Sequence, residues 1–354
     1  MSIIYIVSSG GKLCKEGETL VLHSPECRTT IFPFKTEQLV FLGGVEITGQ
    51  ALSLIMKYKI DTVFLNRNGR FNGRLSFGDS KNVYLRLKQY RLLENDEFKL
   101  KFAKSIVSGK IRNQLNFMQR INRKKENNSQ IFEAIQKTKQ ISDSIDRAES
   151  IEQVRGYEGM AAKYYFSVFR YAINQDWAIF NGRSKNPPED NVNAVLSFLY
   201  TLLFYRVESA IEVEGLDPFA GFFHSVDYGK KTLAFDLMEE FRTPIVDTTT
   251  VALFNLGILN PEDFEEKIFS KKDEEYPLEE ESENVAIEEK KGVLLTKEGI
   301  KKAITHFEKK LDTEIFYQPL GQTITYKRVI REQVNHFHRV VNSEKIEYNP
   351  MIVR

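Results

Sequence analysis

The chain has 354 residues, of which 42% are hydrophobic and 28% are charged, and its formal net charge is +1. This composition is typical of a soluble globular protein, and the length favours two domains. The longest apolar run, residues 195–205, is too short to span a bilayer, and the N-terminus lacks the basic flank and apolar core of a signal peptide. We therefore expect a cytoplasmic protein with no membrane segment.

Residues 1–77 carry a β-rich pattern of short strand-like runs separated by turn residues. One helix is expected among them, with Thr48 as its N-cap. The two cysteines, Cys14 and Cys27, have neither CxxC spacing nor a nearby histidine pair, so we expect free thiols. Residues 78–82 (GDSKN) predict a hinge at the end of this domain.

Residues 83–354 change to a helical pattern, in which apolar residues recur every three or four positions. Ser150 predicts the start of a helix that carries Gly156, Glu158 and Gly159. A glycine inside a helix costs roughly 1 kcal/mol relative to alanine. The pair therefore indicates either close approach of a ligand to the backbone or helix–helix packing.

The small net charge hides two segments of opposite sign. Residues 262–289 contain thirteen acidic residues and three lysines, so residues 262–291 are expected to form a partly mobile loop or insertion. Residues 67–125 contain sixteen Lys and Arg and only four acidic residues, a net charge of +12. A basic surface of this size suits a polyanion such as nucleic acid, and the alternative is a solvated helix face.

The best candidate for chemistry lies between His224 and Arg242. Asp236, Glu239 and Glu240 stand at i, i+3 and i+4, so a helix places them on one face. One imidazole with two or three carboxylates suits Mn²⁺ or Mg²⁺ better than Zn²⁺. The alternatives are a core histidine and a solvated acidic helix end, in which Glu240 is exposed to solvent or instead pairs with Arg242.

Beside a basic surface, such a ligand set indicates metal-assisted attack on a phosphodiester. Other routes to chemistry are not visible, because the sequence contains no Walker loop, GxSxG, dinucleotide-binding fingerprint or HExxH.

Several blocks of the sequence resemble the CRISPR-associated spacer-integrase family, Cas1. The specific combination is Glu158, then a GLDP ahead of His224, then LAFDLMEEFR. The matching blocks extend over nearly the whole chain: residues 69–74, 82–89, 109–114, 156–159, 191–200, 215–218, 223–224 and 233–242.

The resemblance implies an α+β fold, with an N-terminal β-sandwich-like dimerisation domain followed by a larger, mainly α-helical catalytic domain. It also implies a metal-dependent DNA endonuclease and integrase, which joins protospacer 3′-hydroxyl ends to the CRISPR repeat by transesterification. The implied partners are double-stranded DNA (protospacer and repeat), a second copy of the chain in a homodimer, and the small Cas2 protein.

Residue by residue, the resemblance assigns Glu158, His224 and Glu239 as ligands of Mg²⁺ or Mn²⁺, and Asp236 as an adjacent catalytic acid. The basic segment adds expected DNA contacts from Arg70, Arg74, Arg86, Lys99, Lys104 and Arg112, of which the first three have domain or dimer packing as an alternative role. Candidates for positioning the substrate are Tyr165, Asn193, Ser197 and Tyr200, each with core packing as the alternative.

Two other functions fit the same residues. One is a structure-selective DNA repair nuclease that uses the same site. The other is a non-catalytic DNA-binding scaffold, in which Glu158 and His224 are structural.

Overall fold

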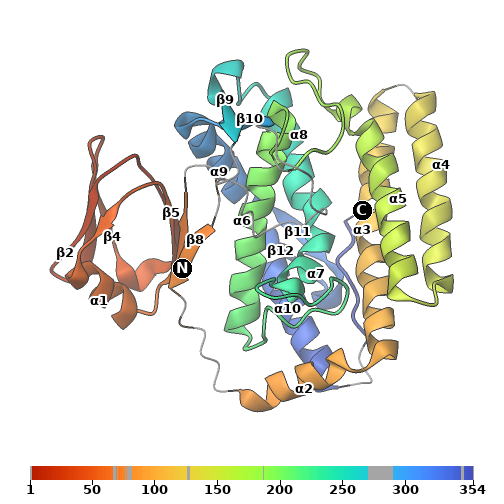
Figure 1. Cartoon of the computed structure of the whole chain (residues 1–354), viewed down its shortest axis with the longest axis horizontal. Coiled ribbons are helices and arrows are strands. Elements are labelled where there is room, and N and C mark those ends of the chain that lie inside the picture. Colours follow the sequence, from red (N-terminus) through yellow and green to blue (C-terminus); the bar gives the residue numbers. More distant parts are fainter. Residues whose placement is uncertain are drawn as a thin grey trace.

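The structure is a computed structural model that describes residues 2–66, 69, 71–75, 77, 82–125, 128–185, 187–269, 290–343 and 347–353. A β-rich N-terminal region is followed by a larger, mainly helical region (Figure 1), so the predicted α+β class is confirmed.

The N-terminal region contains two four-stranded sheets, ordered β1-β5-β7-β8 and β4-β3-β2-β6. In the first sheet β1, β5 and β7 are parallel and β8 is antiparallel to β7. The strands are β1 (Ser2–Val7), β2 (Lys12–Glu16), β3 (Thr19–His23), β4 (Arg28–Ile31), β5 (Thr36–Leu42), β6 (Glu46–Ile47), β7 (Asp61–Leu65) and β8 (Phe71–Leu75).

A small core lies between these sheets and α1 (Gly49–Lys57), and includes Leu13, Leu39 and Leu54. The helix begins where the sequence predicts, because the side chain of Thr48 accepts a hydrogen bond from the backbone N–H of Ala51. Both cysteines are free thiols, as expected.

The helical region is built around α6, with the N-terminal sheets on one side and the α3–α4–α5 bundle on the other (Figure 1). Its helices are α2 (Val83–Leu93), α3 (Asp96–Lys124), α4 (Ser129–Ser144), α5 (Ile151–Phe169), α6 (Asn191–Val213), α7 (Thr232–Phe241), α8 (Thr248–Asn255), α9 (Lys297–Leu311) and α10 (Tyr326–Asn342). A π-helical segment, η4 (Arg242–Asp247), joins α7 to α8, and η3 (Arg170–Ala172) follows α5.

Helix α6 is the one described helix that is long and apolar enough to cross a membrane, but 83% of its apolar window is buried in the fold. It is therefore a core helix, as the sequence predicts for residues 195–205.

The first sheet belongs to both cores. Val40 and Val63 pack in the main helical core, whereas Leu39 and Phe41 on the opposite face pack in the small one. Buried ion pairs reinforce this junction, because Arg74 contacts Asp61, Glu208 and Glu212 at 2.6–2.9 Å. Arg74 is only 5% exposed in these pairs, which favours the packing role over a DNA contact.

The predicted domain limits remain predictions. Of the predicted hinge, residues 78–81 lie outside the described residues, and Asn82 is the N-cap of α2. The ends of the predicted acidic loop are strands rather than loop, because β9 (Phe264–Phe269) pairs with β10 (Lys290–Leu295). Residues 270–289 lie outside the described residues, and β11 (Glu314–Tyr317) and β12 (Gln322–Thr325) form a second hairpin.

Candidate active site

His224 is held by Asp236 from the first turns of α7. Nδ1 of His224 lies 2.7 Å from Oδ1 of Asp236. The buried carboxylate of Asp236 also accepts hydrogen bonds from the backbone N–H groups of Phe222, Phe223 and His224, with N···O distances of 2.6–3.0 Å. These contacts fix the imidazole so that Nε2 faces Glu239, 3.9 Å from Oε1. Asp236 is therefore a positioning group for the histidine.

The loop that carries His224 reaches α7 because of one glycine. A Cβ at Gly221 would lie 2.5 Å from the backbone of Thr232 and 2.8 Å from Oδ2 of Asp236, so no larger residue fits without a shift. Helix α2 supports the same loop from the other side, since the side-chain amide of Gln89 donates to the carbonyls of Asp217 and Ala220.

Glu158 on α5 and Glu239 on α7 meet through Lys110 on α3. The ammonium of Lys110 contacts Oε1 of Glu158 and lies 2.7 Å from Oε2 of Glu239. Arg242, one turn after Glu239, contacts its other oxygen at 3.0 Å. Burial would raise the pKa of Glu239, but Arg242 and Lys110 outweigh burial and lower the pKa to about 2. Glu239 is therefore anionic at neutral pH.

These side chains line a pocket of about 740 Å³, here called the active-site pocket. Three acids from the part of the chain that the structure describes face it: Glu158, Glu239 and Asp247. Among the described residues, six cations face it: Lys110, Arg155, Lys163, Arg183, Lys185 and Arg242. The excess of positive charge suits an anionic ligand such as a phosphodiester.

Of the two glycines of α5, Gly159 lies in the wall of the active-site pocket and Gly156 does not. A Cβ at Gly156 or Gly159 would meet no described heavy atom within 4 Å, so packing against another described helix does not explain them. Gly159 lines the pocket directly. Its missing side chain leaves room for a ligand to approach the helix backbone.

Glu158, His224 and Glu239 are residue types that bind divalent cations, but in this structure they lie too far apart to bind one together. Across the described ranges, no three His, Cys, Asp or Glu side chains lie close enough together to hold a metal ion. The buried Oε2 of Glu239 makes no well-aligned hydrogen bond, although Lys110 lies 2.7 Å away. Lys110 occupies the space between the two carboxylates, so a metal held by Glu158, His224 and Glu239 requires Lys110 to move aside.

Glu240 points away from the active-site pocket. It is fully buried and accepts hydrogen bonds from Tyr348, Gln333 and the backbone of Met351. Burial raises its pKa to about 7. Glu240 is therefore not a solvated helix end, and the ion pair of Arg242 is with Glu239 rather than with Glu240.

The four predicted positioning residues act mostly from behind the pocket wall. Tyr165 and Tyr200 both donate to Asp247, at 2.6 and 2.5 Å, and of the two only Tyr200 lines the active-site pocket. Asn193 and Ser197 accept hydrogen bonds from the guanidinium of Arg183, which does line it.

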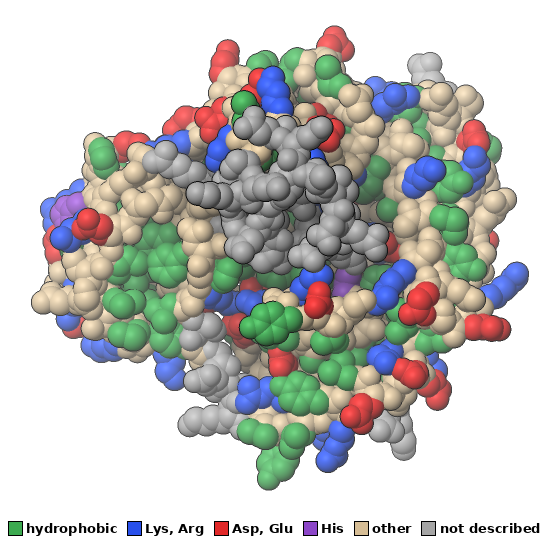
Figure 2. Space-filling model, in the orientation of Figure 1, with side chains coloured by type: hydrophobic (Ala, Val, Ile, Leu, Met, Phe, Trp, Pro, Cys, Tyr) green, Lys and Arg blue, Asp and Glu red, His purple; other side chains and the backbone are tan. Residues whose placement is uncertain are grey.

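None of the described residues predicted to contact DNA lines the active-site pocket. Lys99 pairs with Asp96 and Lys104 donates to a backbone carbonyl, whereas Arg112 is exposed on α3. Arg86 is half-buried on α2, and Arg70 lies outside the described residues. On the face shown in Figure 2, Lys and Arg are interspersed with acidic and apolar side chains rather than gathered in one band.

Sequence reasoning missed most of the cations in the active-site pocket. For two of these cations, the position in the sequence already indicates a place near the candidate ligands. Arg242 stands one helical turn after Glu239, and Lys110 lies inside the quoted block 109–114. Arg183 had no such signal, because it lies in an irregular segment between α5 and α6.

Comparisons with known proteins agree on one family. Residues 4–284 match the family model described as CRISPR associated protein Cas1. The chain is 30% identical to CRISPR-associated endonuclease Cas1 3 of Thermus thermophilus, over all of this chain and 98% of the relative.

Solved structures share the fold. A CAS1 protein from Thermotoga maritima superposes with a TM-score of 0.80 at 20% identity, covering 99% of this chain and all of that one. A chain of a Cas6-RT-Cas1–Cas2 complex gives a TM-score of 0.81 at 19% identity, covering 99% of this chain and 36% of that chain.

Proposed function

Because the chain belongs to the CRISPR-associated Cas1 family, we propose that it is a metal-dependent DNA endonuclease and integrase of CRISPR adaptation. It joins protospacer 3′-hydroxyl ends to the CRISPR repeat by transesterification. The observation that carries this proposal is the convergence of Glu158, His224 and Glu239 on one cation-rich pocket from three separate segments.

The chain's own side chains bind and orient the phosphodiester. Arg155, Lys163 and Arg183 offer cations to the phosphate oxygens, where negative charge grows as the new bond forms. Asp236 holds the imidazole of His224, and Arg242 holds the carboxylate of Glu239, so both groups keep their direction.

The proposed metal ligands are Glu158, His224 and Glu239. When bound there, Mg²⁺ or Mn²⁺ supplies polarisation of the phosphoryl oxygen and a lower pKa for the attacking hydroxyl. Lys110 takes a second role in this arrangement, since its ammonium neutralises the two carboxylates until a metal ion binds.

The proposed partners are double-stranded DNA, a second copy of the chain and Cas2. The name of the structurally similar Cas6-RT-Cas1–Cas2 complex supports the Cas2 partner. Exposed Phe32 and Phe34 on the N-terminal region support its role in dimerisation. A cytoplasmic location fits the free thiols Cys14 and Cys27.

Strand transfer with Mn²⁺ tests the site. We expect Glu158→Ala and His224→Ala to lose it and to keep DNA binding. Glu152→Ala, an exposed carboxylate on the same helix as Glu158, should retain it. If strand transfer survives in both active-site variants, the metal-site proposal is wrong and a scaffold role gains support.

A second assay separates the integrase from a repair nuclease. Protospacer DNA, a repeat-bearing plasmid and Cas2 are supplied together, and the expected product is protospacer joined to the repeat. Cutting of branched DNA without any joined product would favour the repair nuclease.

A further inference from the structure

Residues 347–353, here called the latch segment, run along α3 in an extended, irregular conformation (Figure 1). Seven hydrogen bonds to the backbone of this segment come from described side chains of α3, α7 and α10. These side chains are Ser105, Asn113, Asn116, Glu240, Gln333 and His336. Main-chain bonds of this kind hold extended peptides in protein grooves. The helices therefore hold the latch segment in the way that a protein holds a peptide ligand.

Two side chains anchor the latch segment. Tyr348 and Met351 are each only 5% exposed. The ring centre of Tyr348 lies 5.3 Å from that of Phe102 and 5.9 Å from that of Phe337, and its hydroxyl donates to Glu240 at 2.6 Å. A buried ring whose hydroxyl has a partner makes a specific contact. The segment therefore docks in one defined position.

Asn113 connects the latch segment to the active-site pocket. Its side-chain amide donates to the backbone carbonyls of Met351 and Glu240, both at 2.9 Å, and its oxygen accepts a latch N–H at 2.9 Å. Asn113 stands one turn after Lys110 on α3, and Glu240 directly follows Glu239 on α7. One buried amide therefore ties the latch segment to both helices that carry the Lys110–Glu239 ion pair.

The carboxylate of Glu240 also depends on the latch segment. It accepts hydrogen bonds from the hydroxyl of Tyr348 and the backbone N–H of Met351, while Gln333 of α10 supplies a third. Glu240 is fully buried, and a buried carboxylate that loses its donors is destabilised. If the latch segment left, α7 would have to shift, or water would have to enter the groove. Either change disturbs the neighbouring Glu239.

We propose that the latch segment is a detachable positioning element of the active site. Its docking holds α3 and α7 so that Glu239 keeps its direction in the pocket, and its release removes that constraint. None of the described residues 347–353 lines the active-site pocket, so the segment acts through the helices rather than on substrate. This proposal rests on the proposed function, because Glu239 is a proposed metal ligand.

A pair of substitutions in the full chain tests the latch segment. A Cβ at Gly109 would lie 2.5 Å from Cβ, 2.6 Å from Cγ and 3.9 Å from Cα of Pro350. Gly109→Ala should therefore displace the segment, and adding Pro350→Gly should restore docking, because it removes the two clashing atoms. Strand transfer with Mn²⁺ should fall about 10- to 100-fold in Gly109→Ala. In the double variant it should return to the level of Pro350→Gly alone.

Hydrogen exchange in the presence of a chelator follows the latch segment without metal or catalysis. In Gly109→Ala we expect faster exchange both in the latch segment and in α7. In the double variant both should return to the rates of Pro350→Gly alone. The rise in melting temperature on adding Mn²⁺ should be smaller in Gly109→Ala than in the wild type.

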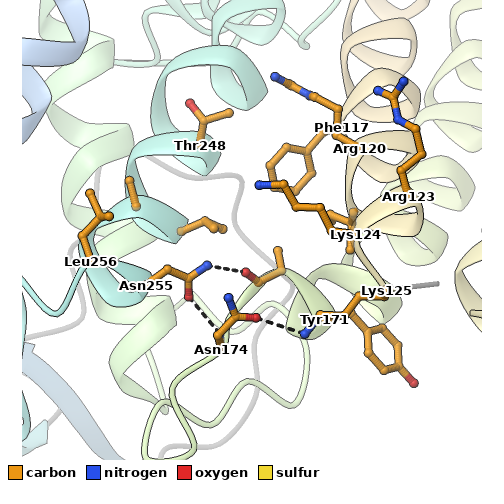
Figure 3. Close-up of a pocket in the computed structure, with 14 residues that line it drawn as sticks. Phe117, Arg120, Arg123, Lys124, Lys125, Tyr171, Asn174, Thr248, Asn255 and Leu256 are labelled. Atoms are coloured by element: carbon orange, nitrogen blue, oxygen red, sulfur yellow. Dashed lines mark hydrogen bonds between the residues drawn. The ribbon is translucent and has the colours of Figure 1, made fainter. Parts of the chain in front are cut away.

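Asn255 provides a matched control. Its amide holds the backbone in the same way, with Nδ2 2.7 Å from the carbonyl oxygen of Ala172 and Oδ1 2.8 Å from the backbone nitrogen of Asn174 (Figure 3). Asn255→Ala should leave exchange in the latch segment and in α7 unchanged. If Gly109→Ala folds poorly, Asn116→Ala tests the same coupling, because it loses one hydrogen bond to the latch backbone.

Three outcomes would overturn the proposal: the latch segment exchanges no faster in Gly109→Ala, it exchanges faster while α7 and strand transfer stay unchanged, or Pro350→Gly restores nothing. A wild type without strand transfer would contradict the proposed function instead. The exchange of α7 in chelator would still decide whether the latch segment positions this helix.

Discussion

Oδ1 of Asp236 lies 2.7 Å from Nδ1 of His224, and this contact turns Nε2 of the imidazole toward Glu239. The carboxylate fixes both the tautomer and the ring direction of the histidine. Asp236 therefore affects chemistry through His224 rather than through substrate.

Asp236→Asn should lower Mn²⁺ affinity and strand transfer about 10- to 100-fold. The amide keeps the shape of the carboxylate, but it cannot stabilise the same imidazole tautomer. Calorimetric titration with Mn²⁺ measures the first effect. Glu152→Gln, at an exposed carboxylate of α5, is the control; equal affinity in all three proteins would show that Asp236 has no such role.

Lys110→Met should lower the stability of the metal-free protein and increase the stabilisation that Mn²⁺ produces. The change leaves Glu158 and Glu239 without the cation between them, and removal of one partner of a buried ion pair costs about 3 kcal/mol. Melting temperatures in chelator and in Mn²⁺ measure both effects. The rise in melting temperature on adding Mn²⁺ should be larger in the variant than in the wild type. Lys163→Met, at an exposed cation of the same pocket, should show a wild-type increment.

Gly159→Ala should stabilise the fold and impair DNA binding. A helical alanine gains about 0.5–1 kcal/mol over glycine, and no described atom obstructs the new methyl group. The methyl group would occupy the space through which, in the proposed function, DNA approaches α5. Gly156→Ala is the matched control, because Gly156 has the same open surroundings and does not line the active-site pocket. Equal DNA affinity in both variants would contradict this role.

Glu240 should make stability fall as pH rises from about 4.5 to about 7. Burial raises its pKa from 4.5 to about 7, so the folded protein binds more protons than the unfolded chain in this window. The contribution is full below pH 4.5 and is lost as pH rises through 7, by up to about 3 kcal/mol. Urea unfolding across this range measures it. In Glu240→Gln this part of the pH dependence should vanish, and an unchanged profile would contradict the assignment.

The main elements of the fold follow from local sequence. Thr48 and Ser150 cap the helices that they were expected to cap, because a side-chain oxygen at an N-cap satisfies backbone N–H groups close by in sequence. The apolar run of residues 195–205 lies in the buried helix α6. The candidate ligands Glu158, His224 and Glu239 also follow from the sequence, where their order and spacing carry the family resemblance.

The tertiary structure decided how those residues are used. Neighbouring Glu239 and Glu240 look alike in sequence, yet one faces the active-site pocket and the other binds the C-terminal tail through Tyr348. Successive side chains on a helix point about 100° apart, and only the elements packed around α7 determine which direction leads to the pocket. Lys110 on α3 reaches both Glu158 on α5 and Glu239 on α7 because these helices pack together. Contacts between residues far apart in sequence depend on how helices pack, and local sequence patterns do not predict that packing.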